Sequence, residues 1–481
     1  MEYKQISRGV IMSSFIWKAL EKLLSHGAHL VIQIILARLL FPSDFGTLAI
    51  IVALVNYIAV FVQSGLTTAI IQKKDISQID INTLFTISIC IAALCYALLF
   101  LLSPVFANYY NNDDLINPIR VAATVLFFYS YNSIQMGILS RRMEFKVIFM
   151  RTAIAVPLSG IIGIVLAYMG FGLWALVTHF ILNIVLASIV MAIGTQTQVR
   201  FQFSWQSAKE LYSFSIKILG ANLISGFGDL FRTMTIGKHY TSSELAYYDR
   251  AYVYSNVVLQ VVNNSIQSVL LPVFSRKQED VLKLKELSRK SIRITVFFVT
   301  PLLLGAAALA KPLILLLLTE KWMPMVPFFM LFCVFRWSGC VVGIDKQVIL
   351  AMGKSSIIFF FEVFLLLSNI TMLFITVPMS IKAIAIGALI IEYTGSLVII
   401  FISKFVYGYS FKERVFDIYK PLVNSLVMVL IMYVLSLLNI GVGFQLIVQI
   451  FGGVIVYYAM AKITRDESLS YFSELVKNRI K

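Results

Sequence analysis

The chain has 481 residues, of which 59% are hydrophobic and only 13% are charged, and its mean hydropathy is +0.87. Soluble domains are about 45–50% apolar and about 25% charged. The composition therefore excludes a soluble enzyme, a disordered chain and a small disulfide scaffold. A membrane-spanning helix needs about 20 apolar residues, and this length has room for about fourteen. The sequence predicts an all-α polytopic membrane protein.

Runs of low charge between loop signals predict the individual spans. Breaks come at Phe41-Pro42, at Gly170-Phe171-Gly172 and in the polar turn from Asn108 to Pro118. The predicted spans are 9–37, 45–71, 81–107, 117–139, 147–169, 172–194, 208–236, 245–274, 290–318, 325–349, 355–377, 381–403, 418–438 and 441–462.

The loops between these spans carry an uneven distribution of positive charge. Counted by side, 28 of the 40 Lys and Arg residues are assigned to one side of the membrane and 7 to the other, which leaves five. Because Lys and Arg accumulate on the cytoplasmic side, this asymmetry predicts that both termini are cytoplasmic. The formal charge of +16 is then explained by the basic loops that orient the helices in the membrane. We therefore predict no nucleic-acid partner.

Two segments are predicted to lie along the membrane surface. Residues 200–205 combine Arg200 with Phe201, Phe203 and Trp205 in a connector, a composition suited to the headgroup boundary. Near the C-terminus, residues 469–480 show apolar side chains at helical spacing, which predicts a short interfacial helix.

A faint internal repeat appears at an offset of 200 residues. Ser13 and Asn56 recur as Ser213 and Asn256, and conservative pairs include Arg38/Lys238 and Asp44/Glu244. The repeat pairs the first two spans with spans seven and eight, so the two halves have the same orientation, as in transporters built from two related lobes. We predict a six-helix lobe over residues 1–200, a second over 201–410, and two additional helices with a cytoplasmic tail over 411–481.

Five basic residues remain after the loop charges are counted, and a charge near the bilayer centre costs about 2.5–3.5 kcal/mol on the gentler scale. Lys18, Lys22 and His26 follow one stripe of the first span, at i, i+4 and i+8. We interpret these three, together with Lys217, Arg232 and Arg336, as a cationic cavity for an anionic, phosphate-bearing substrate. The alternatives are snorkelling to the headgroups for Lys18 and Lys22 and structural ion pairs for the arginines.

Three intramembrane acids are candidates for ion coupling, namely Asp229, Glu362 and Glu392. Such carboxylates carry protons or Na⁺ in coupled transporters. The alternatives are an ion pair between Asp229 and Arg232, and structural pairing of the two glutamates with Arg336 or Lys217. Asp345 and Lys346 are predicted to satisfy each other, and His179 is predicted to be a packed, hydrogen-bonded histidine.

The sequence contains no recognisable catalytic or cofactor motif. It lacks a Ser-His-Asp set, an acidic metal cluster and a nucleotide-binding loop in suitable context. The four cysteines lie in apolar segments and are expected to be free thiols. We therefore predict a transporter without a cofactor or metal, with coupling to an H⁺ or Na⁺ gradient as a candidate energy source.

The stretch Leu36-Ala37-Arg38-Leu39-Leu40-Phe41-Pro42-Ser43-Asp44-Phe45-Gly46 resembles the signature of the polysaccharide-export flippases. This is the Wzx-type and teichuronic-acid-exporter-like branch of the multidrug/oligosaccharidyl-lipid/polysaccharide superfamily. The likeness continues in residues 65–75, 140–146, 170–177 and 271–275. Phe41 departs from the pattern, which usually has Ser or Thr there.

The resemblance implies a fourteen-helix, two-lobed fold that works by alternating access in the bacterial cytoplasmic membrane. The implied cargo is an undecaprenyl-pyrophosphate-linked oligosaccharide, with membrane lipids and polysaccharide polymerase machinery as further partners. A cation-coupled multidrug exporter is the alternative within the superfamily, and an acid-rich cavity would favour it. An O-antigen polymerase or ligase would need a large external loop, which this sequence lacks.

Overall fold

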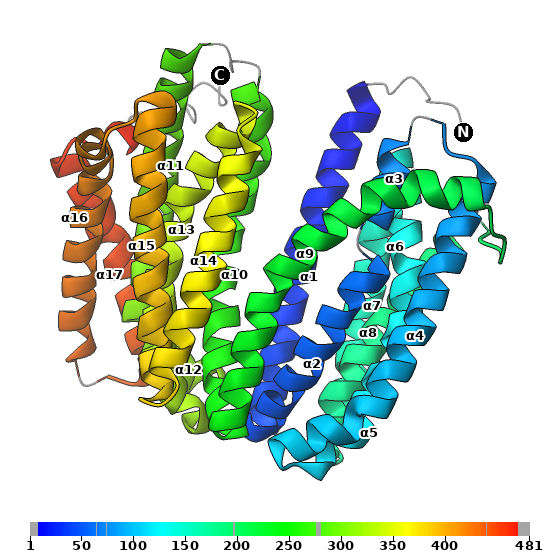
Figure 1. The fold of residues 1–481 in the computed structure, drawn as a ribbon. Coiled ribbons are helices and arrows are strands. Elements are labelled where there is room, and N and C mark those ends of the chain that lie inside the picture. The colour runs from blue at the N-terminus through cyan, green and yellow to red at the C-terminus, as the bar shows by residue number, and fades with distance from the viewer. Residues whose placement is uncertain are drawn as a thin grey trace. The chain divides into compact units, whose positions relative to one another are not determined.

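The computed structural model describes residues 8–469 apart from residues 64, 74, 196–197, 276–279 and 439. Every regular element among these residues is helical, which confirms the predicted all-α class. The α-helices are α1 (Arg8–Leu39), α2 (Pro42–Gln63), α3 (Leu66–Gln72), α4 (Gln78–Tyr110), α5 (Ile116–Ala122), α6 (Val125–Arg142), α7 (Phe145–Tyr168), α8 (Leu173–Gly194), α9 (Trp205–His239), α10 (Ser242–Ser275), α11 (Val281–Ala308), α12 (Ala310–Leu317), α13 (Val326–Ala351), α14 (Ser355–Thr376), α15 (Ile381–Tyr407), α16 (Phe411–Ser436) and α17 (Val442–Ile463) (Figure 1). Two 3₁₀ segments, η1 (Asp113–Leu115) and η2 (Glu320–Met325), precede α5 and α13.

Each predicted span coincides with one of these helices or with two consecutive ones. The span predicted at 45–71 is divided into α2 and α3 at Gly65, which has a positive φ of 80°. In the described part of the chain, eleven helices are long and apolar enough to cross a membrane. The spans predicted at 117–139, 208–236 and 245–274 are also helical, but they are more polar.

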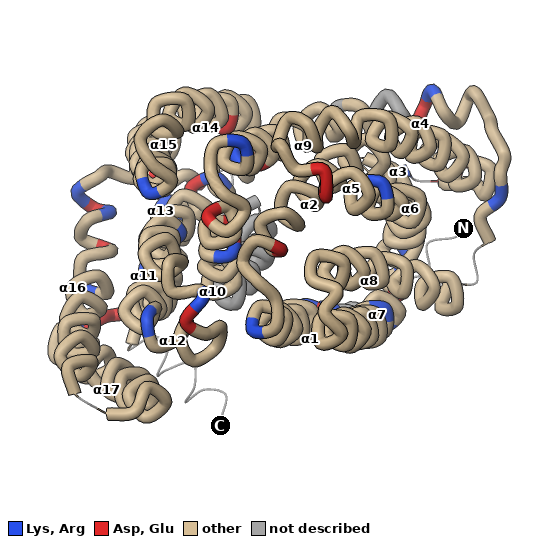
Figure 2. The backbone as a smooth tube through the Cα atoms, turned by 90° about the horizontal axis from the view of Figure 1, so that it is seen from below, with Lys and Arg blue, Asp and Glu red and all other residues tan. Residues whose placement is uncertain are grey.

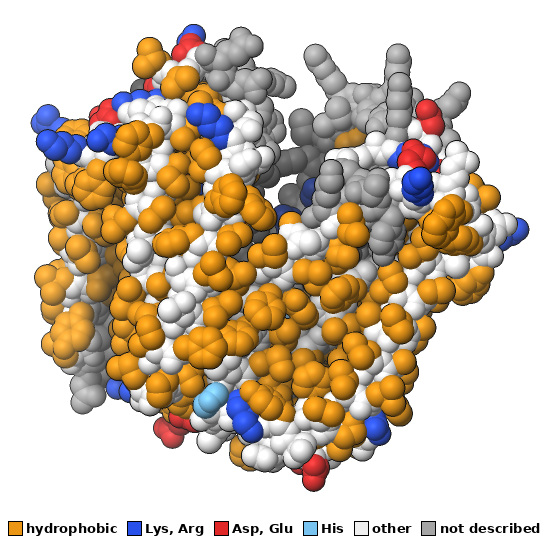
Figure 3. Space-filling model, in the orientation of Figure 1, with side chains coloured by type: hydrophobic (Ala, Val, Ile, Leu, Met, Phe, Trp, Pro, Cys, Tyr) orange, Lys and Arg blue, Asp and Glu red, His pale blue; other side chains and the backbone are white. Residues whose placement is uncertain are grey.

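The side chains on the face shown in Figure 3 are distributed as a membrane requires. Hydrophobic side chains cover the length of the helices, whereas Lys, Arg, Asp and Glu gather at the helix ends. Exposed large apolar residues are numerous on α14 to α17 in particular, among them Phe360, Phe405 and Phe451. A protein in water rarely exposes so much contiguous apolar surface. The protein is therefore a multi-pass membrane protein.

The helix boundaries support the internal repeat. α1 ends at Leu39 and α9 ends at His239, while α2 begins at Pro42 and α10 begins at Ser242. The Asp44 carboxylate accepts a hydrogen bond from the Phe41 main-chain N–H at 3.1 Å, and the Glu244 carboxylate accepts one from the Thr241 N–H at 3.0 Å. At both copies an acid near the helix start thus accepts a hydrogen bond from the main-chain N–H three residues before it, and the Thr241 hydroxyl adds side-chain hydrogen bonds at the second copy.

The chain forms two compact units, residues 1–246 and residues 247–481. The predicted lobe boundaries follow the repeat rather than compactness, and they stay a prediction. In the first unit α7 lies beside both α1 and α8 (Figure 2). Gly160 and Gly163 of α7 make this packing close, because a Cβ on Gly160 would be 2.3 Å from Ile32 Cδ1 and a Cβ on Gly163 would be 2.9 Å from His179 Cβ.

The first unit also contains a very close contact at Gly46, near the start of α2. A Cβ at this position would be 1.7 Å from the main-chain oxygen of Ser242. Only glycine allows the two backbones to approach this closely. Gly46 of the signature motif therefore lies at a close helix contact that a larger residue would obstruct.

In the second unit α11 packs against α13 and α16, and α13 also packs against α15. Buried residues of α11 and α13 form a hydrophobic core with Tyr407 and Tyr409. The additional helix α17 packs against α16 (Figure 2). This packing brings the polar end of α16 next to the polar end of α11.

Candidate functional site

The basic stripe predicted on α1 is present in the first unit. The side chains of Lys18 and Lys22 are exposed, and that of His26 is partly buried. Lys18 Nζ lies 5.4 Å from the centroid of the Phe145 ring. Within the described part of the chain, neither Lys18 nor Lys22 forms an ion pair. Among the described residues, no carboxylate therefore neutralises the charges of Lys18 and Lys22.

Glu21 lies beside this stripe but interacts with a different helix. Its carboxylate accepts a hydrogen bond at 3.2 Å from the Thr152 hydroxyl of α7. This hydrogen bond connects α1 to α7.

The predicted charges on α9 form a local pair. Arg232 Nη2 lies 2.8 Å from Asp229 Oδ1, one helical turn away. The side chain of Asp229 is 67% exposed and that of Arg232 is 25% exposed. Lys217 lies on α9 as well, but its side chain falls outside the described residues. Asp229 is thus engaged by Arg232, as the alternative interpretation of the sequence expected.

The second unit brings together the other three predicted residues, which lie on α13, α14 and α15. The Arg336 guanidinium lies 4.1 Å from the Tyr252 ring centroid, and its Nε is buried without a hydrogen-bond partner among the described residues. Glu392 accepts a hydrogen bond from the Ser338 hydroxyl at 3.4 Å. Glu362 forms an ion pair with Lys346 at 2.6 Å. A cation over an aromatic face gains electrostatic attraction, and the buried Nε of Arg336 has no hydrogen-bond partner among the described residues.

The expected pair between Asp345 and Lys346 is wrong. Asp345 pairs with Arg414 of α16 at 2.7 Å, whereas Lys346 pairs with Glu362 of α14. Consecutive residues on a helix point in directions about 100° apart and do not face each other. The two side chains therefore reach different neighbouring helices, and Glu362 is paired with Lys346 rather than with Arg336 or Lys217.

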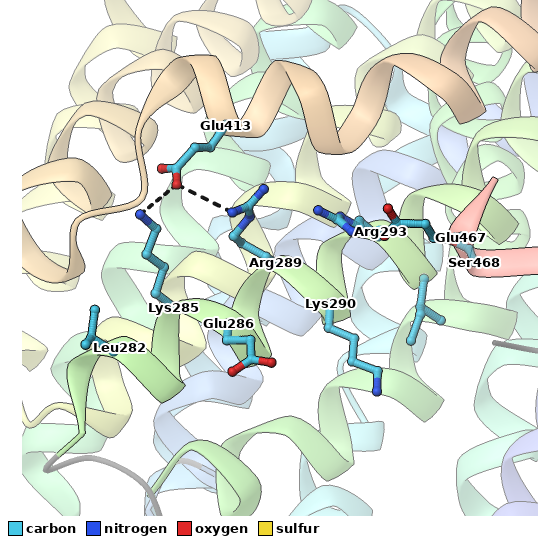
Figure 4. Close-up of a pocket in the computed structure, with 10 residues that line it drawn as sticks. Leu282, Lys285, Glu286, Arg289, Lys290, Arg293, Glu413, Glu467 and Ser468 are labelled. Carbon is cyan, nitrogen blue, oxygen red and sulfur yellow. Dashed lines mark hydrogen bonds and ion pairs between the residues drawn. The ribbon is translucent and has the colours of Figure 1, made fainter. Parts of the chain in front are cut away.

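A charged network that the sequence did not single out lies where α11 meets α16 (Figure 4). Asp417 is buried and accepts hydrogen bonds from Arg289 and Arg293, each at 2.7 Å. Tyr409 donates a third hydrogen bond to Asp417 at 2.8 Å. Burial raises the pKa of Tyr409, so its hydroxyl keeps the proton that it donates.

The same network lines a pocket of about 450 Å³. Glu413 pairs there with Lys285 at 2.7 Å, and Arg293 also contacts Glu467 (Figure 4). The pocket is lined by Leu282, Lys285, Glu286, Arg289, Lys290, Arg293, Ile294, Glu413, Glu467 and Ser468. Each of the cations Lys285, Arg289 and Arg293 has a carboxylate partner. We conclude that the ion pairs of this network hold α16 and Glu467, which follows α17, against α11.

The network was missed because the predicted span began at residue 290, which put Arg289 in a loop. In the structure α11 begins at Val281, where the Asp280 carboxylate accepts a hydrogen bond from the Lys283 main-chain N–H at 3.1 Å. The side-chain hydrogen bond with Lys283 lowers the pKa of Asp280. Arg289 and Arg293 are four residues apart in the sequence, which places them on the same face of a helix. This spacing was the signal from which the network could have been predicted.

Other expectations concern surface segments, cysteines and metals. Phe201, Phe203 and Trp205 are all exposed, as the predicted membrane-surface segment requires. The predicted interfacial helix at 469–480 lies almost wholly outside the described residues. The four cysteines are free thiols. Within the described ranges, His, Cys, Asp and Glu form no group of three or more that could hold a metal ion.

Comparison with solved structures shows the fold. The chain is similar to the structure titled lipid II flippase MurJ in an inward closed conformation, with a TM-score of 0.77, 14% identity, and coverage of 97% of this chain and 100% of that one. It is also similar to an inward-facing multidrug resistance MATE family transporter of the MOP superfamily, with a TM-score of 0.64, 14% identity, and coverage of 80% and 97%.

Comparison with curated sequences finds three relatives named for polysaccharide biosynthesis. The succinoglycan biosynthesis transport protein ExoT of Rhizobium meliloti is 25% identical over 64% of this chain, and the match spans 62% of the relative's own length. The lipopolysaccharide biosynthesis protein WzxC of Escherichia coli is 23% identical over 88% of this chain and 87% of the relative. The teichuronic acid biosynthesis protein TuaB of Bacillus subtilis is 20% identical over 62% of each chain.

The family model described as "Polysaccharide biosynthesis protein" matches residues 35–327, well over half of the chain. This range includes the signature motif around Gly46, the close contact that the motif makes, and the first helices of the second unit. The resemblance noted in the sequence is thereby confirmed, and the chain belongs to the polysaccharide biosynthesis protein family.

Proposed function

We propose that this protein is a flippase that moves an undecaprenyl-pyrophosphate-linked oligosaccharide, the repeat unit of a polysaccharide, across the bacterial cytoplasmic membrane. The family match and the names of the relatives support the polysaccharide class of cargo. The fold shared with a lipid II flippase and with MATE transporters supports alternating access as the mechanism.

One observation carries the proposal, namely that Lys18 and Lys22 are exposed and have no carboxylate partner among the described residues. Lys22 lies within the apolar stretch of this helix that is able to cross the membrane. A charge in that position is costly, and an anionic substrate that binds beside it would lower the cost. A pyrophosphate group offers several oxygen acceptors for ammonium and guanidinium donors. We propose that the cationic residues of the first unit bind this headgroup while the lipid tail stays in the membrane, namely Lys18, Lys22, His26, Lys217 and Arg232. Arg336 of the second unit is proposed as a further ligand of the headgroup.

The driving force is proposed to be an H⁺ or Na⁺ gradient. Glu392 is partly buried and accepts a single weak hydrogen bond from Ser338, so it has acceptor capacity for an ion. Glu362 and Asp229 have cationic partners, Lys346 and Arg232. Of the three candidates, Glu392 is therefore the one that we favour as a coupling residue.

The orientation follows from the loop charges. We propose that both termini are cytoplasmic, which places the network around Asp417 at the cytoplasmic surface. Polysaccharide polymerase machinery is a proposed partner that would consume the cargo after translocation.

The proposal is tested with the double substitution Lys18→Gln and Lys22→Gln. Because glutamine is polar and nearly as long as lysine but carries no charge to neutralise phosphate, we expect export of the cognate glycan to fall at least tenfold while membrane insertion is normal. The matched control is Lys354→Gln with Lys412→Gln, which removes two other exposed lysines and should leave export unchanged.

Normal export in the Lys18 and Lys22 variant would contradict the proposed headgroup site. A strain that lacks this protein is also tested. If it loses resistance to cationic drugs but still exports glycan, the protein is a multidrug exporter instead.

A further inference from the structure

Two lysines of the first unit reach across to each other's helix where α1 meets the start of α7. Lys18 Nζ on α1 lies 5.4 Å from the centroid of the Phe145 ring on α7. In return, Lys146 Nζ on α7 lies 6.0 Å from the centroid of the Trp17 ring on α1. Both lysine side chains are exposed, and neither forms an ion pair within the part of the chain that the structure describes. Because a cation is only weakly attracted to a ring at an exposed site, an anion that binds there can attract both ammonium groups.

Arg151 lies at the same contact, further along α7. α1 and α7 lie side by side (Figure 2), and Trp17 packs against Phe149 with ring centroids 5.1 Å apart. About one turn further along both helices, the Thr152 hydroxyl donates its hydrogen bond to Glu21. The two helices therefore run in the same direction, and Arg151 lies at the depth of Glu21, about two turns inside α7.

The Arg151 guanidinium has only weak interactions with the protein. Its Nη1 donates a hydrogen bond to Met136 Sδ on α6 at 3.4 Å, and a thioether sulfur is a weak acceptor. Glu21 attracts the guanidinium electrostatically, but the two groups form no ion pair within the described ranges. A guanidinium has five N–H donors in a fork that matches phosphate oxygens. Arg151 thus has the donors for a phosphate group and a poor hydrogen-bond partner, at a depth where a charge is costly.

The contact between residues 17–22 of α1 and 145–152 of α7, which we call the α1–α7 seam, has a surplus of positive charge. α7 packs mainly against α8, α1 and α6, and Glu21 is the only acid in the sequences of these four helices. Glu144 directly precedes α7 and is exposed. Even if both acids are counted, four cations leave two positive charges over. The cations of the seam are Lys18 and Lys22 on α1 and Lys146 and Arg151 on α7.

We propose that the pyrophosphate group of the lipid-linked cargo binds at the α1–α7 seam, and that Lys146 and Arg151 are ligands beside the two lysines of α1. The Arg151 fork takes two phosphate oxygens, whereas the lysines act as point charges. Glu21 is a positioning residue that attracts Arg151 and competes with the phosphate oxygens for it. This inference rests on the proposed function in naming the cargo, and it adds two residues that the sequence did not predict for the headgroup.

The site is tested by the binding of radiolabelled undecaprenyl pyrophosphate, without sugars, to the full chain in nanodiscs of neutral phosphatidylcholine. Arg151→Gln is expected to weaken binding about tenfold, because it removes a charge-assisted pair of hydrogen bonds. Arg151→Lys keeps the charge but not the fork and should weaken binding less. Lys146→Gln should also weaken binding, by a smaller factor than Arg151→Gln.

The matched control is Arg200→Gln, which removes another arginine of the first unit. The Arg200 side chain is exposed, and its guanidinium contacts the Gln198 side chain at 3.4 Å. This substitution should leave the dissociation constant unchanged. If Arg151→Gln binds the probe as tightly as Arg200→Gln does, the proposal is wrong.

Glu21→Gln should change binding in the opposite direction. The amide oxygen can still accept the hydrogen bond from Thr152, but the negative charge beside the phosphate group is gone. We expect binding to become about two- to fivefold tighter, the size of effect that a partly exposed charge commonly has. A misfolded variant would not bind more tightly, so this gain separates a binding role from a structural one. Weaker binding of Glu21→Gln would contradict the proposal.

Competition separates the pyrophosphate of the cargo from the phosphate of an ordinary anionic lipid. Replacing part of the phosphatidylcholine with phosphatidylglycerol should leave binding of the probe nearly unchanged. Displacement of the probe by phosphatidylglycerol would show a general site for anionic lipids and would overturn the inference.

Glycan export keeps this inference separate from the proposed function. If the unsubstituted protein binds undecaprenyl pyrophosphate but exports no glycan, the proposed function is wrong and the binding site stands. If export requires Lys18 and Lys22 but is normal in Arg151→Gln, the proposed function stands and the inference about Arg151 is wrong.

Discussion

Arg414 and Asp345 form a buried ion pair in which two guanidinium nitrogens contact the two carboxylate oxygens at 2.7 and 3.0 Å. Their side chains are 2% and 0% exposed. Tyr407 also donates a hydrogen bond to Asp345 at 2.5 Å. Two fully desolvated charges are tolerated because each satisfies the other. The pair connects α16, one of the additional helices, to α13 in the second unit.

Asp345→Asn is expected to lower the free energy of unfolding by about 3–5 kcal/mol, because it leaves Arg414 as an uncompensated buried charge. Thermal unfolding in detergent measures the effect. The control is the double variant Asp345→Leu with Arg414→Met, which removes both charges and should recover much of the loss. Equal instability of the single and double variants would show that the ion pair is not the cause.

Gly46→Ala is expected to destabilise the first unit strongly, because the added Cβ would overlap the Ser242 main-chain oxygen, 1.7 Å away. Backbone atoms cannot rotate aside, so the cost should reach or exceed the about 1–3 kcal/mol of ordinary overpacking. The matched control is Gly220→Ala on α9, where nothing lies within 4 Å and the change should stabilise by about 0.5–1 kcal/mol. If both variants unfold at a lower temperature than the unsubstituted protein, or both at a higher one, this explanation is wrong.

Asp44→Ala and Glu244→Ala should have similar effects, because each acid caps the start of its helix from the equivalent repeat position. We expect a loss of about 1 kcal/mol for each, measured by thermal unfolding. Asp44→Asn, which keeps an acceptor, should lose less. A large effect at one position and none at the other would argue that the repeat does not extend to capping.

The ion pairs of Lys73 should weaken at alkaline pH. Its ammonium lies 3.0 Å from Asp80 and 3.0 Å from Glu210. Partial burial opposes the charged form, but the two carboxylates outweigh it and raise the pKa of Lys73. A raised lysine pKa contributes stability that is fully present below the unfolded-state pKa and is lost as pH rises through the folded-state value.

The stability difference between the unsubstituted protein and Lys73→Gln should therefore be constant below about pH 10 and should shrink above it. The comparison of thermal midpoints from pH 7 to pH 11 measures this. A difference that stays constant over the whole range would mean that Lys73 acts through packing rather than charge.

The amino-acid sequence by itself determined the membrane class, the places of the spans and the family. Apolar runs and loop breaks depend on local composition, so the helix ends at Leu39 and Pro42 and their repeat partners could be read directly. The role of Gly46 could also be inferred, because a glycine beside a helix start in a greasy segment commonly serves close packing.

Only the tertiary structure decided which charges meet. Asp345 and Lys346 are neighbours in sequence, yet they pair with Arg414 and Glu362 on different helices. Asp417 and Arg289 lay just outside the predicted spans, but α11 extends beyond its apolar part and brings Arg289 and Arg293 to α16. A charged side chain is positioned by the direction in which its helix face points and by the helix packed against it. Neither is visible in hydropathy, because both depend on contacts between residues far apart in the chain.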